Sequence, residues 1–63
     1  MQQNEIEIIK AAIPAYKQLK GYYLNRALNC DDIAEAEVLL AKAEAWGRLE
    51  LDSQWALVRE LKS

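Results

Sequence analysis

Apolar residues recur every three or four positions through the first half of the chain, which is the spacing of an amphipathic α-helix. The repeat predicts one helix from about Asn4 to Leu28, with Asn4 as N-cap because its side chain can accept a hydrogen bond from a free backbone N–H. The apolar side consists of Ile6, Ile9, Ala12, Ile13, Tyr16, Leu19, Tyr23 and Ala27, and it is widened by Ile8, Ala15 and Tyr22. This arc approaches roughly 200°, about twice the usual width, so the helix is expected to contact two neighbours.

Pro14 falls inside this first predicted helix. An internal proline removes one backbone hydrogen bond and clashes with the preceding turn, so it either kinks or ends a helix. Because Pro14 lies on the polar side, we favour a single helix kinked at Pro14 and convex toward water. Two separate helices are the alternative.

A second helix is predicted from Asp31 or Asp32 to about Trp46, where Gly47 is expected to end it by adopting a left-handed cap conformation. Asp32 and Glu35 have the spacing of a capping box. The apolar residues of this helix form two sides, the first made of Ile33, Ala36, Leu39, Leu40, Ala43 and Trp46, and the second of Ala34, Val38, Ala41 and Ala45. A helix with two apolar sides is expected to have two partners, and the small residues of the second side allow close approach.

Residues 48–52 are predicted to form a short loop, after which Asp52 or Ser53 caps a third helix that runs to about Lys62. A helix of about ten residues is not stable alone in water, so its apolar residues Trp55, Leu57, Val58 and Leu61 are expected to face inward. The predicted fold class is therefore all-α, with two longer helices (the first kinked at Pro14) and a short C-terminal helix. Residues 1–63 form one helical domain within a homodimeric helical bundle.

The expectation of a homodimer comes from the small size of the chain. With 63 residues, it buries only about 60% of its unfolded surface, which makes a single domain marginally stable. Disulfides, metals and oligomerisation are the usual aids, but Cys30 is the single cysteine and no metal-ligand set is visible. Oligomerisation is therefore the remaining way to stabilise the domain. A twofold contact between two copies requires a self-complementary patch. The candidate interface residues for the homodimer or another partner are Ile9, Ile13, Tyr16, Tyr23, Ala34, Val38, Ala41, Ala45 and Trp55.

Few residues suggest chemistry, since the chain has no histidine. Cys30 with Asp31, Asp32 and Glu35 is the one cluster that resembles a metal site, but zinc sites favour more His and Cys ligands, and the glycine and alternating oxygen ligands of a calcium loop are missing. We interpret the acids as helix caps and a first-turn carboxylate. Cys30 has no histidine to activate it as a nucleophile. We therefore expect no enzyme activity, and we assign no catalytic, metal-binding or cofactor-binding residue.

Charge is uneven along the chain although the net charge is only -2. The first predicted helix carries about +2, and the segment from Asp31 to Asp52 has seven acids and two bases. Such opposite charges influence register and partner choice. Basic residues interleaved with tyrosines in the first helix favour a second hypothesis, a small nucleic-acid-associated regulatory factor, but the basic residues scatter around the helix and we expect no nucleic-acid partner.

The polar, acidic N-terminus lacks the pattern of a secretory signal, and no apolar run approaches the roughly 20 residues of a membrane span. We therefore expect a cytoplasmic protein without membrane contact.

In its length, its helical content and stretches such as 13–16 (Ile-Pro-Ala-Tyr) and 49–52 (Leu-Glu-Leu-Asp), the chain resembles small early-region proteins of lambdoid bacteriophages. The resemblance is to the products encoded between the exonuclease and excisionase genes. It implies an all-helical homodimer, in the host cytoplasm, that promotes lytic development by engaging an unidentified host protein. The chain is thus expected to be a non-enzymatic regulatory protein that acts through protein–protein contacts.

Overall fold

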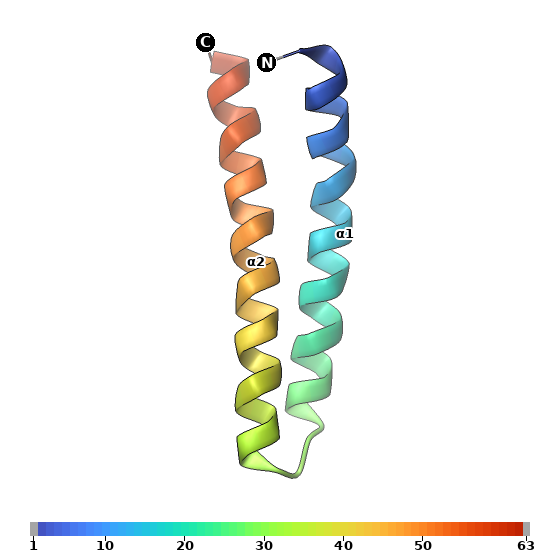
Figure 1. Cartoon of the computed structure of the whole chain (residues 1–63), viewed down its shortest axis with the longest axis vertical. Helices are drawn as coiled ribbons and strands as arrows, with labels where there is room; N and C mark the ends of the chain where they lie inside the picture. Colours follow the sequence, from blue (N-terminus) through green and yellow to red (C-terminus); the bar gives the residue numbers. More distant parts are fainter. Residues whose placement is uncertain (1, 63) are drawn as a thin grey trace.

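Two long helices account for nearly all of residues 2–62, the part of the chain that the computed structural model describes. Helix α1 spans Gln3–Leu28 and helix α2 spans Ile33–Lys62. They lie side by side and antiparallel along their whole length, with the connection at one end (Figure 1). No strand occurs between residues 2 and 62. The structure is an αα-hairpin, which confirms the predicted all-α class.

Helix α1 begins one residue earlier than predicted, and Asn4 is not its N-cap. The extended residue before the helix is Gln2, whose side chain makes no capping hydrogen bond. Asn4 instead lies within the first turn. Gln3 Nε2 donates to Glu7 Oε1 at 2.9 Å, an i,i+4 pair that links the first two turns.

Helix α1 continues through Pro14, so one helix forms rather than two. Pro14 is exposed to solvent, in agreement with its predicted place on the polar side. The kink at this residue stays a prediction.

The connection between the helices is short because both helix ends are capped locally. Asn29 donates its backbone N–H to the Asn25 carbonyl at 3.2 Å, and its side-chain amide donates to the same oxygen at 2.8 Å. At the start of α2, Asp32 Oδ1 accepts from the Ala34 backbone N–H at 3.0 Å. This bond confirms Asp32 as the predicted cap of the second helix.

Helix α2 does not end at Gly47, and the predictions of a loop at 48–52 and of a separate third helix were wrong. Gly47 does not adopt a positive φ. It lies instead against the Lys20 side chain, where a Cβ atom at position 47 would be 2.9 Å from Lys20 Cδ. The glycine therefore allows close packing between the helices instead of ending one of them.

A seven-residue repeat along each helix forms the contact between them. Its positions are 6, 9, 13, 16, 20, 23 and 27 in α1, 30 in the connection, and 36, 39, 43, 46, 50, 53, 57 and 60 in α2, and every one of them is buried or half-buried. This is the pattern of a two-stranded antiparallel coiled coil. It continues without interruption across Gly47, which explains why α2 remains one helix.

The resulting core is thin. Ala27, Leu39 and Ala43 are the buried apolar residues within 2–62, and the larger apolar side chains of the repeat are half-buried. The radius of gyration is 14.5 Å, compared with about 11 Å for a compact protein of this length. Such an elongated hairpin leaves much of its apolar surface in water.

Candidate interaction surfaces

The residues predicted for the interface divide into two groups. Ile9, Ile13, Tyr16 and Tyr23 are half-buried in the seam between the two helices. The Tyr16 ring stacks on Trp46, with ring centroids 5.8 Å apart. Lys42 Nζ lies 5.7 Å from the centroid of the Tyr23 ring. These four residues therefore stabilise the hairpin itself.

The other predicted residues lie on the side of α2 that faces away from α1, which we call the outer side of α2. Its first half carries Ala34, Val38, Ala41 and Ala45, all exposed, as predicted for a second apolar side. Its second half carries the larger residues Leu51, Trp55 and Val58, of which Trp55 is 56% exposed. The prediction that Trp55, Val58 and Leu61 face inward was therefore wrong, because the seam continues through Leu57 on another side of the same helix. A surface pocket occurs on each half, one lined by Ala41, Glu44, Ala45 and Arg48, the other by Leu51, Gln54, Trp55, Val58 and Lys62.

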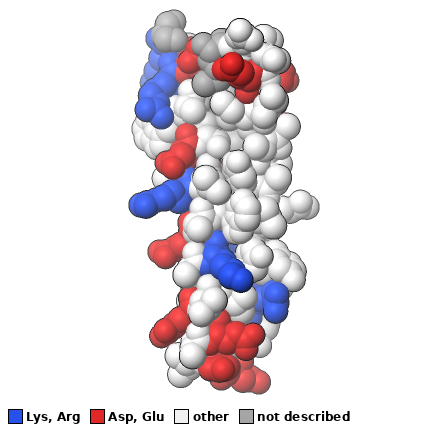
Figure 2. Space-filling view, in the orientation of Figure 1, with Lys and Arg blue, Asp and Glu red and all other residues white. Residues whose placement is uncertain are grey.

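Charge changes sign between these two halves. Glu37 and Glu44 flank the small residues of the first half. Arg48, Arg59 and Lys62 accompany the large residues of the second half and outnumber Asp52, so its net charge is positive. Charged side chains gather along the α2 edge and at the connecting end of the hairpin, and the surface over much of α1 carries few of them (Figure 2). The outer side of α2 is therefore asymmetric in both size and charge.

A second exposed apolar surface lies on α1, next to the seam. It consists of the exposed residues Ile8, Ala15 and Tyr22 with the half-buried Ala12 and Leu19, which recur with spacings of four and three residues, and we call it the α1 stripe. Ile8 and Tyr22 are 65% and 55% exposed. Glu5 precedes the stripe and Arg26 follows it. The three residues that were predicted to widen the apolar arc of this helix all belong to the stripe.

An ion pair in the middle of the seam was not predicted from the sequence. Lys20 Nζ and Glu50 Oε1 are 2.9 Å apart, and their side chains are 40% and 11% exposed. Both residues occupy positions of the seven-residue repeat that normally hold apolar side chains. The repeat could have revealed them, because positions 20 and 50 lie in phase with the apolar residues of their helices.

The basic residues of α1 do not gather into one patch. Lys20 pairs with Glu50, and the Arg26 guanidinium lies 5.6 Å from the Tyr22 ring centroid on a different side of the helix. Lys10 and Lys17 share a third region. No continuous basic surface interleaved with aromatic rings results, so the geometry does not favour the nucleic-acid hypothesis.

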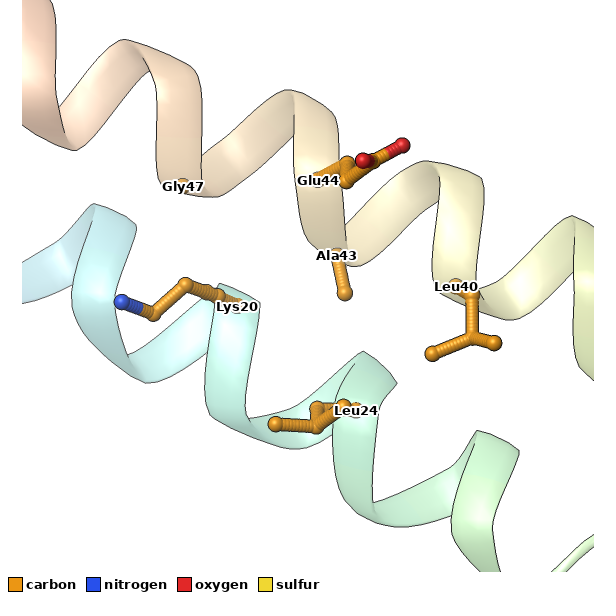
Figure 3. A pocket seen from close by; sticks show the side chains of 6 residues that line it. All are labelled: Lys20, Leu24, Leu40, Ala43, Glu44 and Gly47. Carbon is orange, nitrogen blue, oxygen red and sulfur yellow. The ribbon is translucent and has the colours of Figure 1, made fainter.

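A groove between the helices opens near the connecting end (Figure 3). Leu24 from α1 and Leu40 and Ala43 from α2 line it, Lys20 extends beneath Gly47, and Glu44 points away from α1. The lining brings together no nucleophile and base, and it adds a partly exposed apolar area at the edge of the seam.

Cys30 and the neighbouring acids make local helix contacts. The Cys30 thiol donates to the Asp32 carbonyl oxygen at 3.4 Å, and Asp32 caps α2. Across residues 2–62, no group of three or more His, Cys, Asp or Glu side chains could hold a metal ion. Within the same residues, neither helix combines the length and apolar character that crossing a bilayer requires.

The chain was compared with family models, with curated proteins and with solved structures, and no match was found in any of the three comparisons.

Proposed function

We propose that this chain is a non-enzymatic helical protein that acts through protein–protein contacts, and that its first partner is a second copy of itself. The observation that carries the proposal is the outer side of α2, where one half has small residues flanked by glutamates and the other has large residues and a net positive charge. An antiparallel twofold arrangement brings each half against the opposite half of the partner copy.

The sizes of the facing side chains are complementary when the twofold axis passes near Arg48. Ala41 and Trp55 are each seven residues from Arg48, so Trp55 of one copy packs against Ala41 of the other. Glu37 then lies opposite Arg59 of the partner copy, at equal distances from the axis, whereas Arg48 meets Arg48 and Glu44 meets Asp52. Large side chains that fill the space over small ones, with opposite charges beside them, are typical of specific interfaces.

The exposed area supports the same proposal. The hairpin exposes 4942 Å², whereas a compact monomer of 7.2 kDa exposes about 4100 Å². The excess of about 800 Å² matches the area that each partner buries in an interface of standard size. A twofold contact along α2 removes apolar surface that the thin seam leaves in water.

The resemblance to early-region phage proteins gives this proposal its biological setting. In that setting the homodimer engages a host protein in the host cytoplasm and promotes lytic development. Self-association can be tested without knowing that host protein.

Sedimentation equilibrium over a range of concentrations tests the homodimer, and Ala41→Glu tests the surface. Position 41 is exposed in the single hairpin, so the variant should fold normally but would bury an unpaired carboxylate at the proposed contact. We expect its dimer dissociation constant to rise on the order of tenfold or more.

Gln18→Glu is the matched control, because it adds the same charge at an exposed position of the other helix. It should associate like the wild type. A wild-type chain that stays monomeric up to millimolar concentrations, or an Ala41→Glu variant that dimerises as tightly as the wild type, would contradict the proposal.

A further inference from the structure

The α1 stripe is a second unpartnered surface, on a different helix from the proposed dimer contact. It is uncharged over its whole length, because the charged residues of α1 between Glu5 and Arg26 lie elsewhere around the helix. These residues are Glu7, Lys10, Lys17 and Lys20. On the face drawn in Figure 2, much of the surface over α1 is free of charged side chains. An apolar stripe of about four turns that contains no charge is unusual on an isolated helix surface.

The two ends of the stripe carry opposite charges. Glu5 lies in the first turn of α1, and Arg26 lies in the last turn. Arg26 is held at the end of the stripe by Tyr22, since its Nη1 donates to the Tyr22 hydroxyl at 3.3 Å and its guanidinium lies against the ring. The stripe is therefore apolar along its middle, acidic at one end and basic at the other.

We propose that the α1 stripe binds the α1 stripe of a further copy of this chain, with the two helices antiparallel. Antiparallel pairing about a twofold axis near Ala15 places Glu5 of each copy beside Arg26 of the other. Ala12 and Ala15 lie near this axis, where their small side chains let the helices approach closely. Ile8 and Tyr22 pack at the two outer ends of the contact. A parallel pairing would instead place like charges together at both ends.

This inference extends the proposed function, because a chain with twofold contacts on α1 and on α2 assembles beyond the dimer. At concentrations above those that form the α2 dimer, the wild type should form assemblies larger than a dimer. The α1 contact can nevertheless be tested apart from the α2 contact, in an Ala41→Glu background where association through α2 is disrupted.

Charge reversal at the ends of the stripe provides the decisive experiment. In the Ala41→Glu background, Glu5→Arg gives a chain with two basic ends, and Arg26→Glu gives one with two acidic ends. Each should repel its own copy, whereas a mixture should restore both oppositely charged pairs. We expect sedimentation equilibrium at low ionic strength to show a mixed dimer with a dissociation constant about tenfold below that of either variant alone. The gain should shrink in about 0.5 M salt.

The mixture contains the same two variants as the separate samples, so an effect of either charge reversal on the stability of α1 cannot explain tighter binding in the mixture. Circular dichroism checks that both variants remain helical. A mixture that associates no better than its components would overturn the proposal, and would leave a foreign helix as the occupant of the stripe. It would not affect the α2 proposal, which the Ala41→Glu comparison tests independently.

A second variant tests the middle of the contact. Ala15→Lys in the same background brings two lysines together near the proposed axis and should abolish the remaining association. Gly21→Lys is its control, because it adds the same charge to α1 at an exposed position where nothing lies within 4 Å of a new Cβ. Equal association of these two variants would also overturn the proposal.

Discussion

At the scale of single residues, the two glycines of the chain differ in what surrounds them. A Cβ added at Gly21 meets no atom within 4 Å, whereas one added at Gly47 lies 2.9 Å from Lys20 Cδ. Both residues are helical, and glycine in a helix costs about 1 kcal/mol relative to alanine. Only Gly47 gains something in return, namely space for the lysine that pairs with Glu50.

Gly21→Ala should therefore raise the free energy of unfolding by about 0.5–1 kcal/mol. Gly47→Ala should give a smaller gain, because the new methyl group displaces the Lys20 side chain from its position beside Glu50. Urea denaturation at one protein concentration measures both. In a Lys20→Ala background the two substitutions should give equal gains, and equal gains in the wild type would show that Gly47 has no packing role.

The Lys20–Glu50 pair is the other feature that depends on individual residues. It occupies two positions of the seam with groups that must be desolvated, and pairs of this kind are often less stabilising than apolar residues of similar size. Its geometry nevertheless fixes one alignment of the two helices, since Lys20 must lie opposite Glu50.

Glu50→Gln should lower the free energy of unfolding by about 1–2 kcal/mol, because it leaves the Lys20 ammonium without its counter-ion. The double variant Lys20→Leu with Glu50→Leu should be more stable than the wild type by about 1 kcal/mol or more. Lys17→Leu, at an exposed position of the same helix, should change stability by less than about 0.5 kcal/mol. A double variant less stable than the wild type would show that the pair is strongly stabilising.

At the scale of helices, the sequence allowed α1 to be predicted better than α2. The eight residues predicted for its main apolar side (Ile6, Ile9, Ala12, Ile13, Tyr16, Leu19, Tyr23 and Ala27) are all buried or half-buried. The predicted apolar side agrees with the observed burial because the apolar periodicity of a helix indicates which of its sides is removed from water. The alternation of apolar and polar residues in α1 is strong enough to outweigh the cost of Pro14.

The end of the second helix could not be predicted because local and tertiary signals conflict there. Gly47 followed by Arg48 and a possible cap at Asp52 or Ser53 is a typical local pattern for a break. Glu50 and Ser53 then fall at positions of the repeat where apolar residues would have revealed its continuation. Contact with α1 along the whole length of the hairpin stabilises the helical conformation through these residues. The sequence also did not distinguish the apolar residues in the seam from those that remain exposed. Tyr16 and Tyr22 are the same residue type in the same helix, but Tyr16 is half-buried and Tyr22 is exposed.

At the scale of the whole molecule, the hairpin cannot enclose the side chains it contains. A two-helix structure has one seam, yet both helices carry apolar residues outside it, on the outer side of α2 and on the α1 stripe. Two such surfaces on opposite helices suit an assembly of hairpins in which each helix has two neighbours, as the wide apolar arcs predict.

Trp55 gives a direct optical test of this assembly. Trp46 is stacked on Tyr16 within the seam, so Trp46→Phe keeps an aromatic ring there and leaves Trp55 as the single tryptophan. Trp55 is 56% exposed in the separate hairpin, and packing against Ala41 of a second copy would remove it from water. Its fluorescence maximum should therefore move to shorter wavelength as protein concentration rises. With Ala41→Glu added, the maximum should stay at the long-wavelength position over the concentrations at which the parent variant dimerises. An emission maximum that is independent of concentration in both variants would mean that Trp55 remains in water and that α2 does not form the contact.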